Sequence, residues 1–281
     1  MQNVTVIGAG TMGNGIAHVF AQSGFTVTLV DIKQEALDKA VATIKSNLDR
    51  QVKKAVITEA DASATLGRIT ASTDMAGAAK ASDFIVEAAT ENYELKTKIF
   101  KTLDENAKEG VILATNTSSI SVTMLAATTS RAERVIGMHF FNPVPVMKLI
   151  EIIRGIKTTD EVYATVKELS EKLGKTPVEV NDFPGFVSNR ILMPMINEAI
   201  YCVMEGVAKP EDIDTVMKLG MAHPMGPLAL ADFIGLDVCL AIMNVLHEGL
   251  GDTKYRPSPL LKKMVAAGML GKKSGQGFYK Y

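Results

Sequence analysis

Apolar residues follow two different spacings along the first two thirds of the chain. Short runs rich in β-branched residues, such as 4–7, are typical of strands buried on both faces of a parallel sheet. Stretches with apolar residues every three or four positions, such as 16–21, indicate helices. The predicted strands are 4–7, 26–30, 69–72, 83–87, 111–115, 134–139, 147–153 and 176–180. Further helices are predicted at 31–56, 58–66, 92–107, 121–126 and 160–173.

Strands that alternate with helices in this way predict a Rossmann-type doubly wound α/β sheet, in which 31–66 form an inserted helical hairpin. The pattern changes after the segment Asn-Asp-Phe-Pro-Gly at 181–185, where strand patterns almost disappear. Helical spacing then continues through 191–204, 210–217, 228–246 and 260–267. The sequence therefore predicts two domains, a dinucleotide-binding domain at 1–184 and an all-α domain at 185–281.

A glycine-rich turn lies between the first predicted strand and the helix that follows it. Gly8, Gly10 and Gly13 form the pattern G-x-G-x-x-G, and Asp31 follows the next strand, near the spacing of about 20 residues that this motif requires. The start of a helix offers N–H groups and a positive dipole end to a pyrophosphate. A carboxylate at Asp31 suits ribose hydroxyls and repels a 2′-phosphate. The motif therefore predicts NAD as the cofactor.

Composition and charge exclude several classes of protein. The 281 residues carry a formal net charge of -1, so no overall field would attract nucleic acid or an anionic membrane. No run of eighteen apolar residues indicates a membrane span. Cys202 and Cys239 are the only cysteines, and the histidines are scattered, so neither a disulfide framework nor a metal site is expected. These features favour the cytoplasm.

His139 and Glu151 are the candidate acid-base pair. His139 ends one predicted strand and Glu151 lies in the next, so the two side chains would approach each other if these strands are neighbours in the sheet. A carboxylate bonded to one ring nitrogen fixes the tautomer and leaves the other nitrogen as a base. Such a pair suits removal of a proton from an alcohol. On spacing alone, however, a histidine and a glutamate this far apart are more often unrelated.

Lys45, Arg50, Lys53 and Lys54 form a basic cluster on the helix predicted at 31–56, and the last three lie near its end. One interpretation is an ordinary solvated helix face. The other is a surface that receives the phosphates of a substrate, for which lysine is a suitable partner.

The helical region is rich in methionine. Seven of its methionines are Met193, Met195, Met204, Met217, Met221, Met225 and Met243. They are interpreted either as core residues or as part of a subunit interface, because a small helical domain cannot bury so much apolar surface alone. We expect a homodimer formed through this domain.

The chain resembles the short-chain L-3-hydroxyacyl-CoA dehydrogenases over essentially its whole length, and among them the stand-alone 3-hydroxybutyryl-CoA dehydrogenases of bacteria. Several long motifs in the right order are more specific than the glycine turn alone. They are V-I-G-A-G-T-M-G at 6–13, E-A-A-T-E-N at 87–92, A-T-N-T-S-S at 114–119, G-M-H-F-F-N-P at 137–143, K-L-I-E-I-I at 148–153, D-F-P-G-F-V-S-N-R at 182–190 and H-P-M-G-P at 223–227.

The resemblance implies roles for particular residues. His139 would be the catalytic base and Glu151 its orienting partner, with Ser118 and Asn189 as further catalytic polar groups. The implied substrate contacts are Ser118, Asn142, Asn189, Arg50, Lys53 and Lys54. The implied cofactor contacts are Gly8, Gly10, Thr11, Met12, Gly13, Asp31, Ala89, Glu91, Lys96, Asn116, Ser118 and Asn142.

The resemblance also implies the reaction. The expected activity is NAD-dependent interconversion of acetoacetyl-CoA and (S)-3-hydroxybutyryl-CoA, a step of fatty acid and butanoate metabolism, by a homodimer. Two alternatives stay open: a dehydrogenase of a free hydroxy acid or sugar acid, and a catalytically silent NAD-binding protein.

Overall fold

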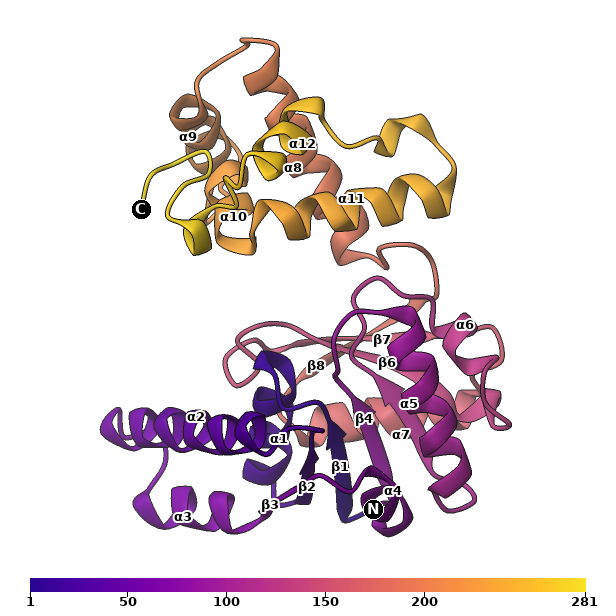
Figure 1. Cartoon of the computed structure of the whole chain (residues 1–281). Coiled ribbons are helices and arrows are strands. Elements are labelled where there is room, and N and C mark those ends of the chain that lie inside the picture. The colour runs from indigo at the N-terminus through magenta and orange to yellow at the C-terminus, as the bar shows by residue number, and fades with distance from the viewer. The chain divides into compact units, whose positions relative to one another are not determined.

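The computed structural model describes residues 1–281 as two compact units, Met1–Asp182 and Phe183–Tyr281 (Figure 1). The division falls two residues before the boundary that the sequence suggests. The first unit contains every strand of the sheet, and the second is built from helices. Each unit has a hydrophobic core of its own.

The first unit is an eight-stranded sheet in the order β3-β2-β1-β4-β5-β6-β7-β8. All neighbouring strands are parallel except β6 and β7, which are antiparallel. The predicted strands are confirmed, with ends that agree to within two residues. They are β1 (Asn3–Ile7), β2 (Thr26–Val30), β3 (Ile69–Ser72), β4 (Phe84–Glu87), β5 (Ile112–Thr115), β6 (Val135–Phe140), β7 (Leu149–Arg154) and β8 (Thr176–Asn181).

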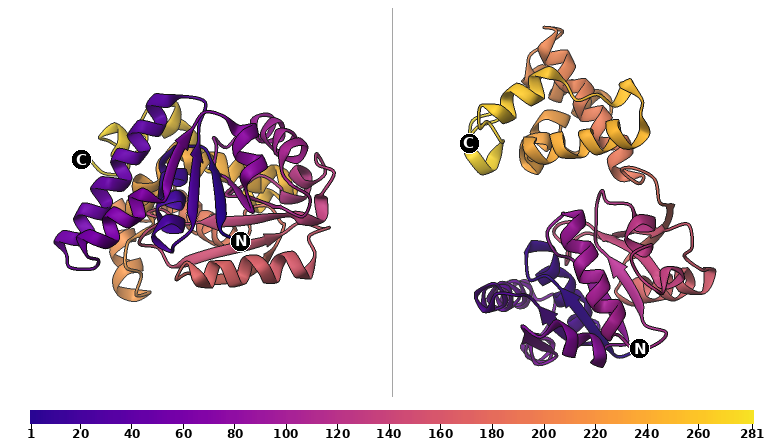
Figure 2. Two further views of the ribbon diagram at one scale, coloured as in Figure 1. Left: turned by 90° about the horizontal axis from the view of Figure 1, so that it is seen from below. Right: turned by 45° about the vertical axis from the view of Figure 1, so that its right-hand side comes forward.

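Helices cover this sheet, as the doubly wound fold requires (Figure 1, Figure 2). One of them, α4, was absent from the sequence prediction because its alanine-rich segment shows little contrast between apolar and polar positions. The only local sign is Asp74, whose side chain caps the helix by accepting a hydrogen bond from the Gly77 N–H. The helices are α1 (Thr11–Gln22), α2 (Gln34–Lys53), α3 (Glu59–Gly67), α4 (Met75–Ala81), α5 (Tyr93–Asn106), α6 (Val122–Ala126) and α7 (Asp160–Lys172).

The helical hairpin of α2 and α3 packs beside α1 (Figure 1). Helix α2 buries Leu37, Ala40, Ile44 and Leu48, which recur at intervals of three or four residues on one face. Thr58 starts α3 through a reciprocal capping box with Asp61. The face of α2 that flanks this stripe carries polar side chains and lines a cavity beside the glycine turn.

The second unit packs its helices around Met193, Ile200, Leu228, Leu236 and Leu246. Its helices are α8 (Ser188–Met204), α9 (Pro210–Gly220), α10 (Pro227–Ile234), α11 (Leu236–Leu250) and α12 (Pro259–Ala266). This unit also contains the short 3-10 helices Thr253–Tyr255 and Lys272–Ser274, and the first unit contains a third at Ala132–Arg134.

The single helix predicted at 228–246 is wrong. It is two helices, α10 and α11, bent by 99°. The break is at Gly235, whose φ of 105° lies in a region that only glycine adopts readily, so a helix cannot continue through it. No single helix of the chain is long and apolar enough to cross a membrane; α10 and α11 reach that length and composition only as this bent pair.

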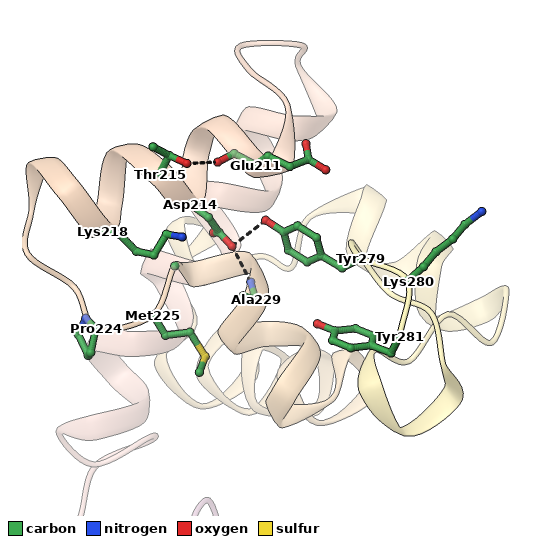
Figure 3. A pocket seen from close by; sticks show the side chains of 11 residues that line it. Glu211, Asp214, Thr215, Lys218, Pro224, Met225, Ala229, Tyr279, Lys280 and Tyr281 are labelled. Atoms are coloured by element: carbon green, nitrogen blue, oxygen red, sulfur yellow. Dashed lines mark hydrogen bonds between the residues drawn. The ribbon is translucent and has the colours of Figure 1, made fainter.

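Two buried carboxylates fasten the last residues to the helical unit. Asp214 accepts hydrogen bonds from the Ala229 N–H and the Tyr279 hydroxyl (Figure 3). Asp232 accepts hydrogen bonds from the N–H groups of Phe278 and Tyr279. Burial and the neighbouring Asp214 carboxylate raise the pKa of Tyr279. These contacts hold the C-terminal residues beside α9 and α10, along a cavity of about 600 Å³.

Candidate active site

The glycine turn lies between β1 and α1 and is held by the residues that end β2. The Gly8 N–H donates to the Val30 carbonyl over 2.7 Å, and Asp31 Oδ2 accepts from the Ala9 N–H over 2.8 Å. The other oxygen of Asp31 accepts from the Lys33 N–H over 3.1 Å. No side chain caps the start of α1, so no capping side chain occupies its first N–H groups.

The three glycines of the turn differ in what an added side chain would meet at each position. Gly8 has a φ of 101°, and a Cβ there would lie 2.7 Å from the Ala88 carbonyl oxygen. A Cβ on Gly13 would collide with the Gly8 carbonyl. Gly10, in contrast, has an ordinary φ of −66°, and a Cβ on it would meet no atom of the chain within 4 Å. The chain leaves this space open, and the dinucleotide-binding motif assigns it to the approach of a pyrophosphate.

A cavity of about 450 Å³ opens beside this turn. It is lined by residues 9–11, 14 and 15, by the loop residues 142–145 and by one face of α2. The α2 face contributes Lys39, Thr43 and Asn47, which the sequence prediction missed. Their spacing of four residues along one helix was the available signal.

A buried ion pair fixes the ends of β4 and β5. Glu87 accepts from Lys96 Nζ and from the Ala89 N–H, each over 2.7 Å, and its second oxygen accepts from Thr115 Oγ1 over 2.7 Å. Lys96 Nζ also donates to the Ala89 carbonyl and lies 3.5 Å from Glu91. Lys96 is 1% exposed. Its ammonium group therefore acts on this side of the sheet by holding Ala89 and Glu91 in place.

Glu91 in turn fixes the residues that follow β5. Its Oε1 accepts from Thr117 Oγ1 over 2.6 Å and from the N–H groups of Ser118 and Ser119, each over 3.0 Å. Burial by itself would raise the pKa of Glu91, but the Lys96 charge and these hydrogen bonds hold that pKa below its ordinary value. An ionised Glu91 thus sets the position of the Ser118 turn.

His139 and Glu151 face each other across the antiparallel strands β6 and β7. They are direct partners in the register, and His139 Nδ1 lies 2.9 Å from Glu151 Oε2. Both side chains are buried, and the ring of Phe141 packs 4.6 Å from that of His139. Because an ionised carboxylate can only accept, Nδ1 carries the proton and Nε2 has the lone pair. This arrangement is suited to accepting a proton at Nε2.

Asn116 connects these strand ends. Its N–H donates to the Glu87 carbonyl over 2.7 Å, and its Oδ1 accepts from the Phe140 N–H over 2.9 Å. The residues that follow β1, β4, β5 and β6 therefore meet at the carboxyl edge of the sheet, where ligands bind in doubly wound folds.

Two family models match the chain almost from end to end. Residues 3–183 match the NAD binding domain of 3-hydroxyacyl-CoA dehydrogenase, and residues 185–281 match its C-terminal domain. The chain belongs to the 3-hydroxyacyl-CoA dehydrogenase family. The resemblance drawn from the sequence motifs is thereby confirmed.

Relatives of this 3-hydroxyacyl-CoA dehydrogenase family member cover it completely. A protein of Bacillus subtilis named probable 3-hydroxybutyryl-CoA dehydrogenase is 59% identical over 100% of the chain and 98% of its own length. The human mitochondrial hydroxyacyl-coenzyme A dehydrogenase is 45% identical over 100% of the chain and 91% of its own. The crystal structure of (S)-3-hydroxybutyryl-CoA dehydrogenase from Ralstonia eutropha has a TM-score of 0.97 at 57% identity, covering 100% of this chain and 99% of that one.

The residues of this dehydrogenase fit NAD, the cofactor that its first family model names. The open space beside Gly10 leaves room for a pyrophosphate to approach the backbone. The uncapped start of α1 offers N–H groups to it, and the Asp31 carboxylate after β2 is suited to ribose hydroxyls.

The structure brings most of the predicted site residues together in the first unit. Asn189 belongs to the second unit, where it lies in the first turn of α8 and its N–H donates to the Gly185 carbonyl over 3.1 Å. Arg50, Lys53 and Lys54 are exposed at the C-terminal end of α2 and do not line the cavity beside the glycine turn.

Gly10→Ala tests whether the space beside the turn is a binding site. The added Cβ meets no atom of the chain, so we expect the free energy of unfolding in urea to change by no more than about 0.5 kcal/mol. The affinity for NADH, measured by fluorescence titration, should fall about tenfold, because the Cβ blocks the approach of the pyrophosphate.

Gly67→Ala is the matched control, since Gly67 in α3 also has open space around it. Equal NADH affinities of the two variants would show that Gly10 does not border the cofactor.

Proposed function

We propose that this dehydrogenase interconverts acetoacetyl-CoA and (S)-3-hydroxybutyryl-CoA with NAD. The observation that carries the proposal is the buried His139–Glu151 pair, 2.9 Å apart, which lies at the same sheet edge as the glycine turn. Names of relatives support the choice of substrate. The Bacillus subtilis relative, 59% identical, is named probable 3-hydroxybutyryl-CoA dehydrogenase. A Bradyrhizobium diazoefficiens relative, 56% identical, is named 3-hydroxybutyryl-CoA dehydrogenase.

In the oxidative direction His139 is the base. NAD, when bound, supplies the acceptor for the hydride that leaves C3 of the substrate. His139 Nε2 accepts the proton of the C3 hydroxyl, so that a C–H and an O–H bond are replaced by the carbonyl. Glu151 holds the ring in the required tautomer and stabilises the imidazolium that forms. In the reductive direction the same imidazolium returns the proton to the oxygen.

Polar side chains orient the substrate in this proposal. Ser118 belongs to the turn that Glu91 fixes, so its position is set by backbone hydrogen bonds. Asn142 lines the cavity beside the glycine turn. As the family resemblance implies, we assign Ser118 and Asn189 to the substrate oxygen and to the support of the dyad, and Asn142 to the border of the same pocket. Holding the substrate and cofactor in one geometry removes much of the entropic cost of their reaction.

The exposed cluster of Arg50, Lys53 and Lys54 is assigned to the phosphates of CoA, with Lys54 as its main member. These residues end α2, the helix whose other turns line the cavity. A cation at a helix C-terminus also interacts favourably with the helix dipole, so the cluster has a structural reason as well. The experiment on this cluster must therefore separate binding from stability.

The dyad is tested by His139→Ala and Glu151→Gln. Loss of the base should lower kcat for acetoacetyl-CoA reduction by about a hundredfold to ten-thousandfold. The Gln amide can donate to Nδ1 and so favours the wrong tautomer, which should lower kcat about a hundredfold. Steady-state kinetics with NADH measures both effects.

NADH affinity of both variants should stay within about twofold of the unmodified protein, since neither residue belongs to the glycine turn. Turnover by His139→Ala that matches the unmodified protein would remove the proposed mechanism. Unchanged kcat in Glu151→Gln would show that Glu151 does not orient the ring.

CoA recognition is tested by Lys53→Gln combined with Lys54→Gln. Losing two cations should raise KM for acetoacetyl-CoA severalfold and leave kcat unchanged, because uniform binding is removed. The effect should vanish with acetoacetyl-pantetheine, which lacks the nucleotide phosphates.

Lys80→Gln, at an exposed position of α4 outside the cluster, is the control. A double variant with an unaltered KM would speak against CoA binding at α2 and would favour a free hydroxy acid as substrate.

We also propose that the protein is a homodimer through the helical unit. Large apolar side chains are exposed on α9, on α10 and between them, which is costly for a monomer. They are Val216, Leu219, Met221, Met225 and Phe233. Met193 and Met243 belong to the core instead. In this proposal some methionines of the unit therefore pack in its core and others belong to the subunit interface.

Leu219 is 83% exposed on α9. We expect Leu219→Glu to halve the mass measured by light scattering, because a carboxylate would be buried unpaired in the interface. Lys209→Glu, a polar position next to α9, should leave the mass unchanged. An unmodified protein with the mass of one chain would contradict the proposal.

Both cysteines are free thiols, which supports a reducing compartment, and we propose the cytoplasm.

The proposed substrates are four-carbon acyl-CoA thioesters. We therefore assign the reaction to fatty acid and butanoate metabolism.

A further inference from the structure

Lys175 is a buried lysine whose charge is bonded to backbone carbonyls. It lies between α7 and β8 and is 8% exposed. Its Nζ donates to the Val144 carbonyl over 2.5 Å and to the Met147 carbonyl over 2.7 Å. Burial lowers the pKa of its ammonium group, and no carboxylate opposes that effect. An apolar side chain of the same length would avoid this cost of burial. Packing alone therefore does not explain a lysine at this position, and the two hydrogen bonds are the feature that an apolar residue could not provide.

Both carbonyls belong to the loop 143–147. This loop is also bonded within itself, because the Pro143 carbonyl accepts from the N–H groups of Val146 and Met147, each over 2.9 Å. On another side it packs against α1: Val144 is buried, and a Cβ on Gly15 would lie 2.8 Å from the Val144 Cβ. The loop is therefore held between the start of α1 and the Lys175 ammonium group.

The buried His18 is part of the same environment. It follows Gly15 by one helical turn and is fully buried on α1. Burial lowers its pKa to about 4, a side-chain hydrogen bond with Gln22 opposes this, and the positive charge of Lys175 lowers it further. The His18 ring is therefore neutral near pH 7 and adds no second positive charge beside Lys175.

The loop matters because it forms one wall of the cavity beside the glycine turn, which Gly10 and Thr11 also line. Pro143, Val144 and Pro145 line the cavity of about 450 Å³ together with Asn142 and the glycine turn. The same loop joins β6 to β7, the strands of His139 and Glu151. A shift of the loop 143–147 toward or away from α1 would therefore change the width of this cavity.

We propose that Lys175 is a positioning residue for NAD binding, which sets the loop 143–147 against the glycine turn through its two hydrogen bonds. The kinetic measurement with acetoacetyl-CoA rests on the proposed function, whereas the measurement of NADH affinity needs only the cofactor.

The experiment compares Lys175→Met, which keeps the length and loses the donors, with Lys175→Arg, which keeps donors for two carbonyls. Lys172→Met, at an exposed position near the end of α7, is the control. NADH dissociation constants are measured by fluorescence titration well below each unfolding temperature. Steady-state kinetics with acetoacetyl-CoA then separates kcat from KM.

We expect Lys175→Met to raise the NADH dissociation constant about tenfold and the KM for NADH by a similar factor, while kcat at saturation changes less than threefold. Lys175→Arg should stay within about threefold of the unmodified protein, and Lys172→Met should equal it. A purely structural role would lower the unfolding temperature without this split between binding and turnover.

An NADH affinity of Lys175→Met equal to that of Lys172→Met would overturn the proposal. So would an equal loss in Lys175→Arg and Lys175→Met, which would show that packing and not hydrogen bonding matters. If Lys175→Met does not fold, Lys175→Gln replaces it. An NADH affinity of Lys175→Gln equal to that of Lys175→Arg would then overturn the proposal. An unmodified protein that binds NADH but does not reduce acetoacetyl-CoA would refute the proposed function alone, because the NADH measurement stands without it.

Discussion

The antiparallel pairing of β6 and β7 is the constraint on which the site depends. Directly opposed residues of antiparallel strands have their side chains on the same face, and here His139 and Glu151 are such a pair. A slip of one residue in this register would move Glu151 to the other face of the sheet. The strands on either side of this pair run parallel to their neighbours, so one reversed pairing places both members of the dyad at the edge where the glycine turn also lies.

Charged groups with several hydrogen bonds recur around this edge, and each one fixes the backbone of a segment that follows a strand. Glu87 and Lys96 hold Ala89, Glu91 holds the Ser118 turn, and Lys175 contacts the loop between β6 and β7. Buried charges are costly unless hydrogen bonds satisfy them. Their cost is offset here by several bonds to each group, and the result is a set of loops whose backbones are fixed by these bonds in addition to packing.

The sequence was sufficient for the sheet because β-branched runs and glycines carry strong local signals. It was insufficient where the signal is weak or lies far away in the chain. Alanine-rich α4 has no amphipathic pattern, and Gly235 could have been read as an ordinary helical residue. The contact of His139 with Glu151 could be stated only as conditional on strand order. Nothing local to Lys175 indicates that its partners lie near residue 145, since those contacts arise from tertiary structure alone.

The hydrogen bonds that converge on Glu91 bear on how a pH–rate profile of this enzyme is interpreted. Its carboxyl group binds a proton more weakly than an ordinary glutamate, whose pKa is about 4.3. The Ser118 turn therefore keeps its acceptor as acidity increases, and loses it only when the pH falls through that lowered pKa. An inflection in rate between about pH 5 and pH 8 must then be assigned to another group, because Glu91 is already ionised throughout that range.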